Sequence, residues 1–77
     1  MRPSELVTLL AREQGDMSER TFARKLGINH SYWNRLRKGE YGTTWALLCA
    51  GIRAFPLLTE EIWTAARHDC QRTVRVA

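Results

Sequence analysis

Four hydrogen-bonding side chains lie close together in the middle of the chain. His30, Ser31, Asn34 and Arg35 have the spacing that places side chains on one face of a helix. Imidazole, hydroxyl, amide and guanidinium groups can donate or accept hydrogen bonds toward the polar edges of planar molecules. These four residues are therefore the first candidates for direct recognition of a partner.

Positive charge is concentrated around the same residues. Residues 19–38 hold six Lys or Arg residues and one acid, Glu19, which gives +5, whereas the other 57 residues sum to −1. The whole chain carries +4, with a sequence pI of about 9.7. A basic balance by itself also suits anionic lipids or acidic proteins. Here the positive charge coincides with a hydrogen-bonding face. This combination favours duplex DNA as the partner, because DNA offers both phosphates and base edges.

Apolar residues recur at helical spacing through the chain, which predicts an all-α fold. Ser4, Ser18 and Asn29 are residue types that favour helix N-caps, and Thr43 or Thr44 can cap a later helix. Gly27 and Pro56 are expected to end helices. We therefore expect a compact domain of five short helices, covering about residues 4–14, 18–27, 30–38, 44–55 and 59–70.

The same spacing predicts which side chains form the core. Trp63 is open to two interpretations, a core residue or a contact between two copies. Cys49 and Cys70, which show no metal-ligand spacing, are expected to be small buried residues. The expected inward-facing residues are Leu6, Val7, Leu10, Ala11, Phe22, Ala23, Leu26, Ile28, Trp33, Leu36, Trp45, Leu48, Ile52, Phe55, Ile62, Trp63 and Ala66.

The second and third expected helices are joined by a very short turn. Two helices joined in this way by a glycine-containing turn cross at a large angle. Gly27 can adopt a positive φ there, and Ala23 is small where the two helices approach. Trp33 and Leu36 are expected to anchor the third helix from beneath. Its hydrogen-bonding face would then point outward.

Residues 18–39 resemble the Cro/repressor-type (XRE-like) helix-turn-helix family. The apolar rhythm of residues 45–55 extends the resemblance to about residues 4–70. The matching positions are the apolar or small residues Phe22, Ala23, Leu26, Ile28, Trp33 and Leu36, the cap Asn29, and the glycines Gly27 and Gly39. The resemblance implies a lambda-repressor-like domain over residues 1–71, followed by a short basic tail, 72–77.

The resemblance also implies a partner and a set of contacts. Members of this family bind operator-like double-stranded DNA, usually as homodimers. Carried over by position, the base contacts are His30, Ser31, Asn34 and Arg35. The expected DNA backbone contacts are Arg20, Tyr32, Arg37, Lys38 and Tyr41, together with the amides around Gly39.

Three positions depart from the family pattern, and one of them is Arg37, where many members have an acid near the end of the third helix. Glu19 stands where many members have a glutamine that contacts a phosphate, and a carboxylate would repel one. Arg20 or the amides at the start of that helix are expected to take this role instead. Trp33 is bulkier than the usual Ile or Val, which could displace the third helix outward.

These observations favour a cytoplasmic transcription regulator, a small phage-like repressor that acts by occupying an operator. The alternative is a protein-interaction module, such as an antitoxin or phage adaptor, that uses the same helical fold.

The sequence contains no paired carboxylates, nucleophile–base pair or phosphate-binding loop that would suggest an enzyme. We expect no cofactor, metal, small-molecule ligand or membrane association. Polar and apolar residues alternate weakly over tail residues 73–76. This segment is expected to be either a frayed terminus or a strand added across a dimer.

Overall fold

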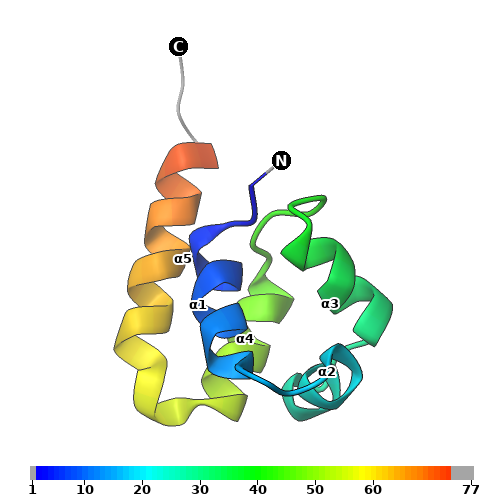
Figure 1. Ribbon diagram of the computed structural model, residues 1–77. Coiled ribbons are helices and arrows are strands. Elements are labelled where there is room, and N and C mark those ends of the chain that lie inside the picture. Colours follow the sequence, from blue (N-terminus) through cyan, green and yellow to red (C-terminus); the bar gives the residue numbers. More distant parts are fainter. Residues whose placement is uncertain (1, 74–77) are drawn as a thin grey trace.

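The computed structural model describes residues 2–73, with side chains through residue 71, and confirms the all-α class. This part of the chain forms five α-helices and no strand (Figure 1). The tail residues 74–77, and with them the question of an added strand, lie outside the described residues. The helices are α1 (Glu5–Gln14), α2 (Glu19–Leu26), α3 (His30–Arg37), α4 (Trp45–Ala54) and α5 (Thr59–Thr73), with a 3-10 helix, η1 (Pro56–Leu58), before α5.

The predicted N-caps begin the first four helices. The Ser4 Oγ accepts the Val7 amide at 3.3 Å, and the Ser18 Oγ accepts the Thr21 amide at 3.1 Å. Asn29 and Thr44 cap α3 and α4 in the same way. Each cap satisfies an amide that has no partner inside its own helix. Local sequence therefore determines where these helices begin.

All five helices contribute side chains to one hydrophobic core. α1 and α4 both pack against α5, while α2 packs against α3 and α4 (Figure 1). Trp33 is fully buried, with its ring centroid 5.1 Å from that of Phe22. Its indole Nε1 donates to the buried Gln14 Oε1 at 3.0 Å. The bulky Trp33 is thus accommodated inside the core, because Phe22 flanks the ring and α1 supplies a hydrogen-bond acceptor.

The predicted inward face of α4 is partly wrong. Leu48 is buried, but Trp45 is 70% exposed, and Leu47 and Gly51 are buried instead. A Cβ at Gly51 would lie 3.5 Å from a Leu10 methyl of α1 and 3.6 Å from an Ile62 methyl of α5, so this glycine faces both helices. Packing against these two helices turns the face containing positions 47, 48 and 51 inward and leaves Trp45 at the surface.

Three further expectations are corrected in and around α5. Cys49 and Cys70 are both exposed rather than buried, because each lies beside an inward-facing residue on its helix. Trp63 is 44% exposed, so it is not an ordinary core residue. α5 continues through Thr73, past the expected end near Cys70 and into the segment assigned to the tail.

Asp69 connects three parts of the fold that are distant in sequence. Its carboxylate accepts the Glu5 amide at 2.7 Å and the Leu6 amide at 3.1 Å, at the start of α1. It also accepts the Thr43 hydroxyl at 2.7 Å, just before α4. A negative charge at a helix N-terminus is favourable. Asp69 therefore holds α1, the loop before α4 and α5 together.

Within residues 2–73, the helices are all too short or too polar to cross a lipid bilayer.

Candidate nucleic-acid interface

The turn between α2 and α3 fixes the position of α3. Gly27 has φ 78°, in the left-handed region that favours glycine. The Ile28 amide donates to the Ala23 carbonyl at 3.0 Å. From α4, the Arg53 Nη2 donates to the Leu26 carbonyl at 3.1 Å. The end of α2 is therefore held both by its own turn and by a neighbouring helix.

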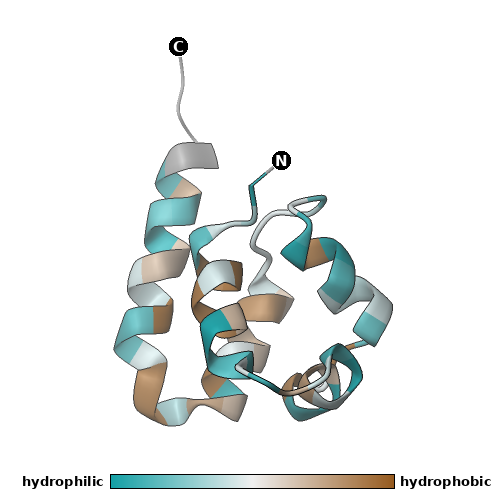
Figure 2. Cartoon of the chain, viewed as in Figure 1, coloured by the Kyte–Doolittle hydropathy of each residue, from teal (hydrophilic) through white to brown (hydrophobic). Residues whose placement is uncertain are grey.

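The outer face of α3 carries the predicted base-contacting residues. His30, Ser31 and Arg35 are exposed, while Asn34 is partly buried. On the opposite side of the helix, the predicted anchors Trp33 and Leu36 are fully buried. In Figure 2 most of the α3 ribbon has the colours of hydrophilic or intermediate residues. A rigidly anchored helix thus presents a polar, hydrogen-bonding surface to solvent.

Glu19 lies against this surface, where it engages two of the predicted contacts. The Asn34 Nδ2 donates to the Glu19 Oε1 at 2.6 Å, and the Arg37 Nη1 donates to the Glu19 Oε2 at 2.7 Å. The hydrogen bond from Asn34, and then the Arg37 charge, hold the pKa of Glu19 below its ordinary value despite some desolvation. Glu19 therefore joins the start of α2 to the side of α3.

This pairing also defines the orientation of the Asn34 amide. A carboxylate only accepts hydrogen bonds, so the Asn34 nitrogen must face Glu19. The Asn34 oxygen and its second N–H then remain for another partner. Glu19 was not expected to contact a phosphate, and its observed position beside Asn34 and Arg37 gives it a different role.

On the other side of α3, Arg35 is connected to the loop before α4. The Arg35 Nη1 donates to the Tyr41 hydroxyl at 3.1 Å, and this bond is the main reason that the pKa of Arg35 is raised. The Tyr41 ring centroid lies 5.7 Å from that of Tyr32. The Tyr32 hydroxyl in turn shares a hydrogen bond with the Thr44 hydroxyl at 3.2 Å. Arg35, Tyr32 and Tyr41 are thus brought together.

The end of α3 differs from expectation in one respect. The amides of Gly39 and Glu40 donate to the carbonyls of Leu36 and Arg35, each at 3.0 Å. Because both amides already have partners within the chain, the amides at Gly39 and Glu40 are not available to a phosphate. Lys38 is exposed at the end of α3, and Arg20 is exposed at the start of α2. These two side chains stay available for an anion.

The predicted site residues thus form two connected groups and several separate exposed side chains. Glu19, Asn34 and Arg37 form one group, and Arg35, Tyr32, Tyr41 and Thr44 form the other. No sequence pattern indicated Thr44 as a partner of Tyr32. One feature of the sequence could have identified Glu19 as a partner of these side chains: it is the one acid in residues 19–38, a segment with six Lys or Arg residues.

Comparison with models of known protein families, with curated proteins and with solved structures finds no match to this chain. Its function has to be argued from its own residues.

Proposed function

We propose that the chain is a sequence-specific, double-stranded DNA-binding transcription regulator with a lambda-repressor-like helix-turn-helix formed by α2 and α3. The observation that carries this proposal is the outer face of α3. Exposed hydrogen-bonding residues line that face, buried Trp33 and Leu36 fix it from beneath, and the segment around it carries +5. A major groove accepts an α-helix and presents donors, acceptors and phosphates that match such a surface.

The residues divide into two roles. Arg35 reads a base, with guanine as the partner that best matches a guanidinium. Asn34, in the orientation fixed by Glu19, reads a second base, and His30 and Ser31 lie in the first turn, where recognition helices meet base edges. Arg20 and Lys38 neutralise phosphates, and Arg37, whose charge is paired with Glu19, donates its remaining N–H groups to the DNA backbone. The hydroxyls of Tyr32 and Tyr41 supply hydrogen bonds at the edge of the site.

The regulator acts by occupancy. Bound at an operator, it blocks access of polymerase, as a small phage-like repressor would. Two copies bind a palindromic site with half-sites about one helical turn apart. Phosphate contacts provide much of the affinity, and α3 provides the specificity.

A second candidate function is a protein-interaction module in which the helical fold docks another protein. The two exposed tryptophans, Trp45 and Trp63, favour this alternative, because exposed apolar patches mark interaction sites. Those side chains come from α4 and α5 rather than from the basic segment, so they do not compete with the DNA proposal for the same surface.

Selection of bound duplexes from a random pool tests the proposal. We expect one enriched, palindromic duplex, and affinity for it that falls with salt at a log–log slope of about −0.9 per phosphate contact. The control is the double variant Asn34→Ala, Arg35→Ala, which should keep the salt dependence and lose the enriched sequence. A pool that shows no enriched duplex with the unmodified chain would contradict sequence-specific regulation.

A further inference from the structure

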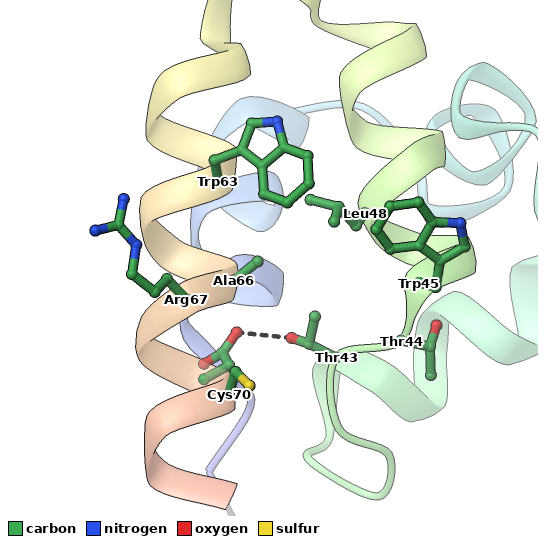
Figure 3. A pocket seen from close by; sticks show the side chains of 9 residues that line it. Thr43, Thr44, Trp45, Leu48, Trp63, Ala66, Arg67 and Cys70 are labelled. Atoms are coloured by element: carbon green, nitrogen blue, oxygen red, sulfur yellow. Dashed lines mark hydrogen bonds between the residues drawn. The ribbon is translucent and has the colours of Figure 1, made fainter. Parts of the chain in front are cut away.

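A groove of about 690 Å³ lies between α4 and α5 (Figure 3). Its walls are apolar side chains that face one another from the two helices: Trp45, Leu48, Trp63 and Ala66. The two indole rings meet edge to face, with centroids 6.2 Å apart. Sites for small molecules are concave, mostly apolar and about 300–1,000 Å³ in volume. The size and the lining of this groove match such a site.

Two of the three tryptophans line the groove and remain accessible to solvent. Trp45 is 70% and Trp63 is 44% exposed, whereas Trp33 is fully buried. The proposed DNA contacts use neither of the exposed indoles. One planar ligand can cover both, and aromatic rings packed offset or edge to face attract each other beyond the gain from buried area. The indoles therefore favour an aromatic ligand over an aliphatic one of similar size.

The charge that the groove offers to a ligand is positive. Asp69 lines the groove, but its carboxylate already accepts two amides of α1 and the Thr43 hydroxyl. Arg67 also lines the groove, and among the residues that the structure describes its guanidinium has no hydrogen bond or ion pair. The groove thus complements an anion.

Arg67 is placed to meet that anion at the rim. It follows Trp63 by four residues, so the two side chains share a face of α5. Figure 3 shows the guanidinium at the outer side of α5, where no polar contact holds it and the exposed side chain can turn toward a ligand on Trp63. A carboxylate is the anion of a small organic molecule that a planar guanidinium pairs with best.

The limited apolar area favours a small molecule over a protein. A protein interface of standard size buries about 800 Å² on each partner, whereas an aromatic side chain buries about 150–250 Å². On α5, exposed polar side chains surround the indole: Glu60, Thr64 and Arg67. Two indoles with a polar rim are therefore too small a surface for a typical protein partner, but large enough for a pair of fused rings.

We propose that the groove between α4 and α5 binds a small planar aromatic carboxylate. The rings pack against Trp45 and Trp63, and Arg67 pairs with the carboxylate at the rim. The sequence alone predicted no small-molecule ligand, since the groove exists only where α4 and α5 pack together. The evidence for this site and its tests do not depend on the proposed DNA-binding function.

An NMR titration of the intact chain with 2-naphthoate provides the first test. The indole N–H resonance of Trp33 serves as an internal reference, because that group donates to Gln14 in the core. We expect saturable shifts of the Trp45 and Trp63 indole resonances, with a dissociation constant below about 1 mM for a ligand of this size, and a constant Trp33 resonance. Shifts that do not saturate, or equal shifts at all three indoles, would overturn the inference.

Three further probes test the chemical class of the ligand. 2-Naphthamide keeps the rings without the charge, 2-naphthylmethylammonium reverses the charge, and octanoate keeps the carboxylate without the rings. Each should bind about threefold to fivefold more weakly than 2-naphthoate, the amide and the ammonium because they lose the ion pair and octanoate because it loses the ring contacts. An equally tight amide would contradict the anion, and equally tight octanoate would contradict the aromatic class.

Substitution of either exposed indole tests the ring contacts. Trp63→Ala and Trp45→Ala should each raise the dissociation constant of 2-naphthoate about tenfold, with an unchanged helical circular dichroism spectrum. Leu57→Ala is the matched control, because Leu57 is 96% exposed and lies outside the groove; it should leave binding intact. Unchanged binding in both folded tryptophan variants would place the ligand elsewhere.

Substitution of Arg67 tests the charge contact. Arg67→Gln should weaken 2-naphthoate to the level of 2-naphthamide and leave the affinity for 2-naphthamide unchanged. Arg12→Gln removes the same charge from an exposed position on α1, outside the groove, and should change neither affinity. If Arg67→Gln and Arg12→Gln weaken 2-naphthoate equally, the effect comes from the net charge of the chain and the proposed pairing with Arg67 is wrong.

Discussion

Among the single residues, Arg35 and Glu19 differ in how strongly they are bonded at the outer face of α3. Arg35 is exposed and bonded to the Tyr41 hydroxyl, a contact that a base could replace at small cost because it is solvent-accessible. Glu19 is bonded to Asn34 and Arg37 through charge-assisted hydrogen bonds, which are stronger than neutral ones. We therefore expect Arg35 to change partners on binding and Asn34 to keep its orientation.

The first prediction concerns Arg35→Ala. It should cost about 1–3 kcal/mol on the enriched duplex and relax the preference at one base position. The measurement is a binding titration on the enriched duplex and on its single-base variants. Lys38→Ala is the comparison, since loss of a phosphate contact weakens all duplexes alike. Equal loss on every duplex for Arg35→Ala would show that Arg35 contacts only the backbone.

The second prediction concerns the pH dependence of the Glu19 contacts. The pKa of Glu19 is lowered in the folded chain, mainly by the Asn34 hydrogen bond. The stabilisation is therefore present above the ordinary glutamate value of about 4.3 and is lost as pH falls through the lower, folded value. The Asn34 side-chain amide resonances should shift in that acidic range and stay constant near neutrality. Glu19→Gln should abolish the shift; an identical shift in that variant would assign it to another carboxylate.

At the scale of helices, the α2–α3 turn combines a backbone requirement with a tertiary contact. Gly27 needs a positive φ, and a Cβ at this position would lie 2.6 Å from the Arg53 Nη2. That nitrogen is the one that donates to the Leu26 carbonyl. Substitution of Gly27 thus affects both the turn and its support from α4.

The third prediction is that Gly27→Ala lowers the free energy of unfolding by about 1–2 kcal/mol, because a left-handed conformation is unfavourable for a residue with a Cβ. Urea unfolding followed by circular dichroism measures it. Gly42→Ala serves as the control, since Gly42 has no positive φ and open space around its Cβ position. If the two variants lose equal stability, the positive φ at Gly27 is not the cause.

At the scale of the whole molecule, Asp69 determines how α1 meets α5. Its carboxylate accepts two amides at the start of α1, 64 and 63 residues away in sequence, and the Thr43 hydroxyl, 26 residues away. The Ser4 and Thr43 hydroxyls also share a hydrogen bond at 2.8 Å, in which Ser4 is the donor because the single Thr43 proton goes to Asp69, and this bond adds the α1 cap to the same network. These contacts hold the two ends of the described fold together.

The fourth prediction follows from this network. Asp69→Ala should lower the free energy of unfolding by about 2–3 kcal/mol, because buried donors lose a charged acceptor. Thermal and urea unfolding measure the loss. Gln71→Ala is the comparison on the exposed side of α5 and should change stability little. An Asp69→Ala chain as stable as the unmodified one would show that water replaces the carboxylate.

The starts of the first four helices and the core around α2 and α3 could be predicted from the amino-acid sequence. Ser4, Ser18 and Asn29 cap helices as expected, because capping is a local interaction between neighbours in sequence. Phe22, Ala23 and Trp33 are buried as the helical spacing predicts. The exposure of His30, Ser31 and Arg35 follows from the same periodicity.

The rotation of α4 and the partners of the polar residues depend on how the helices pack, and they could not be predicted from the sequence. The apolar spacing in α4 allows two overlapping inward faces, and packing against α1 and α5 buries Leu48 and Gly51 and leaves Trp45 exposed. Glu19, Gln14 and Asp69 find partners from 15 to 64 residues away. Such pairings depend on how whole helices pack, and a one-dimensional pattern carries no information on that packing.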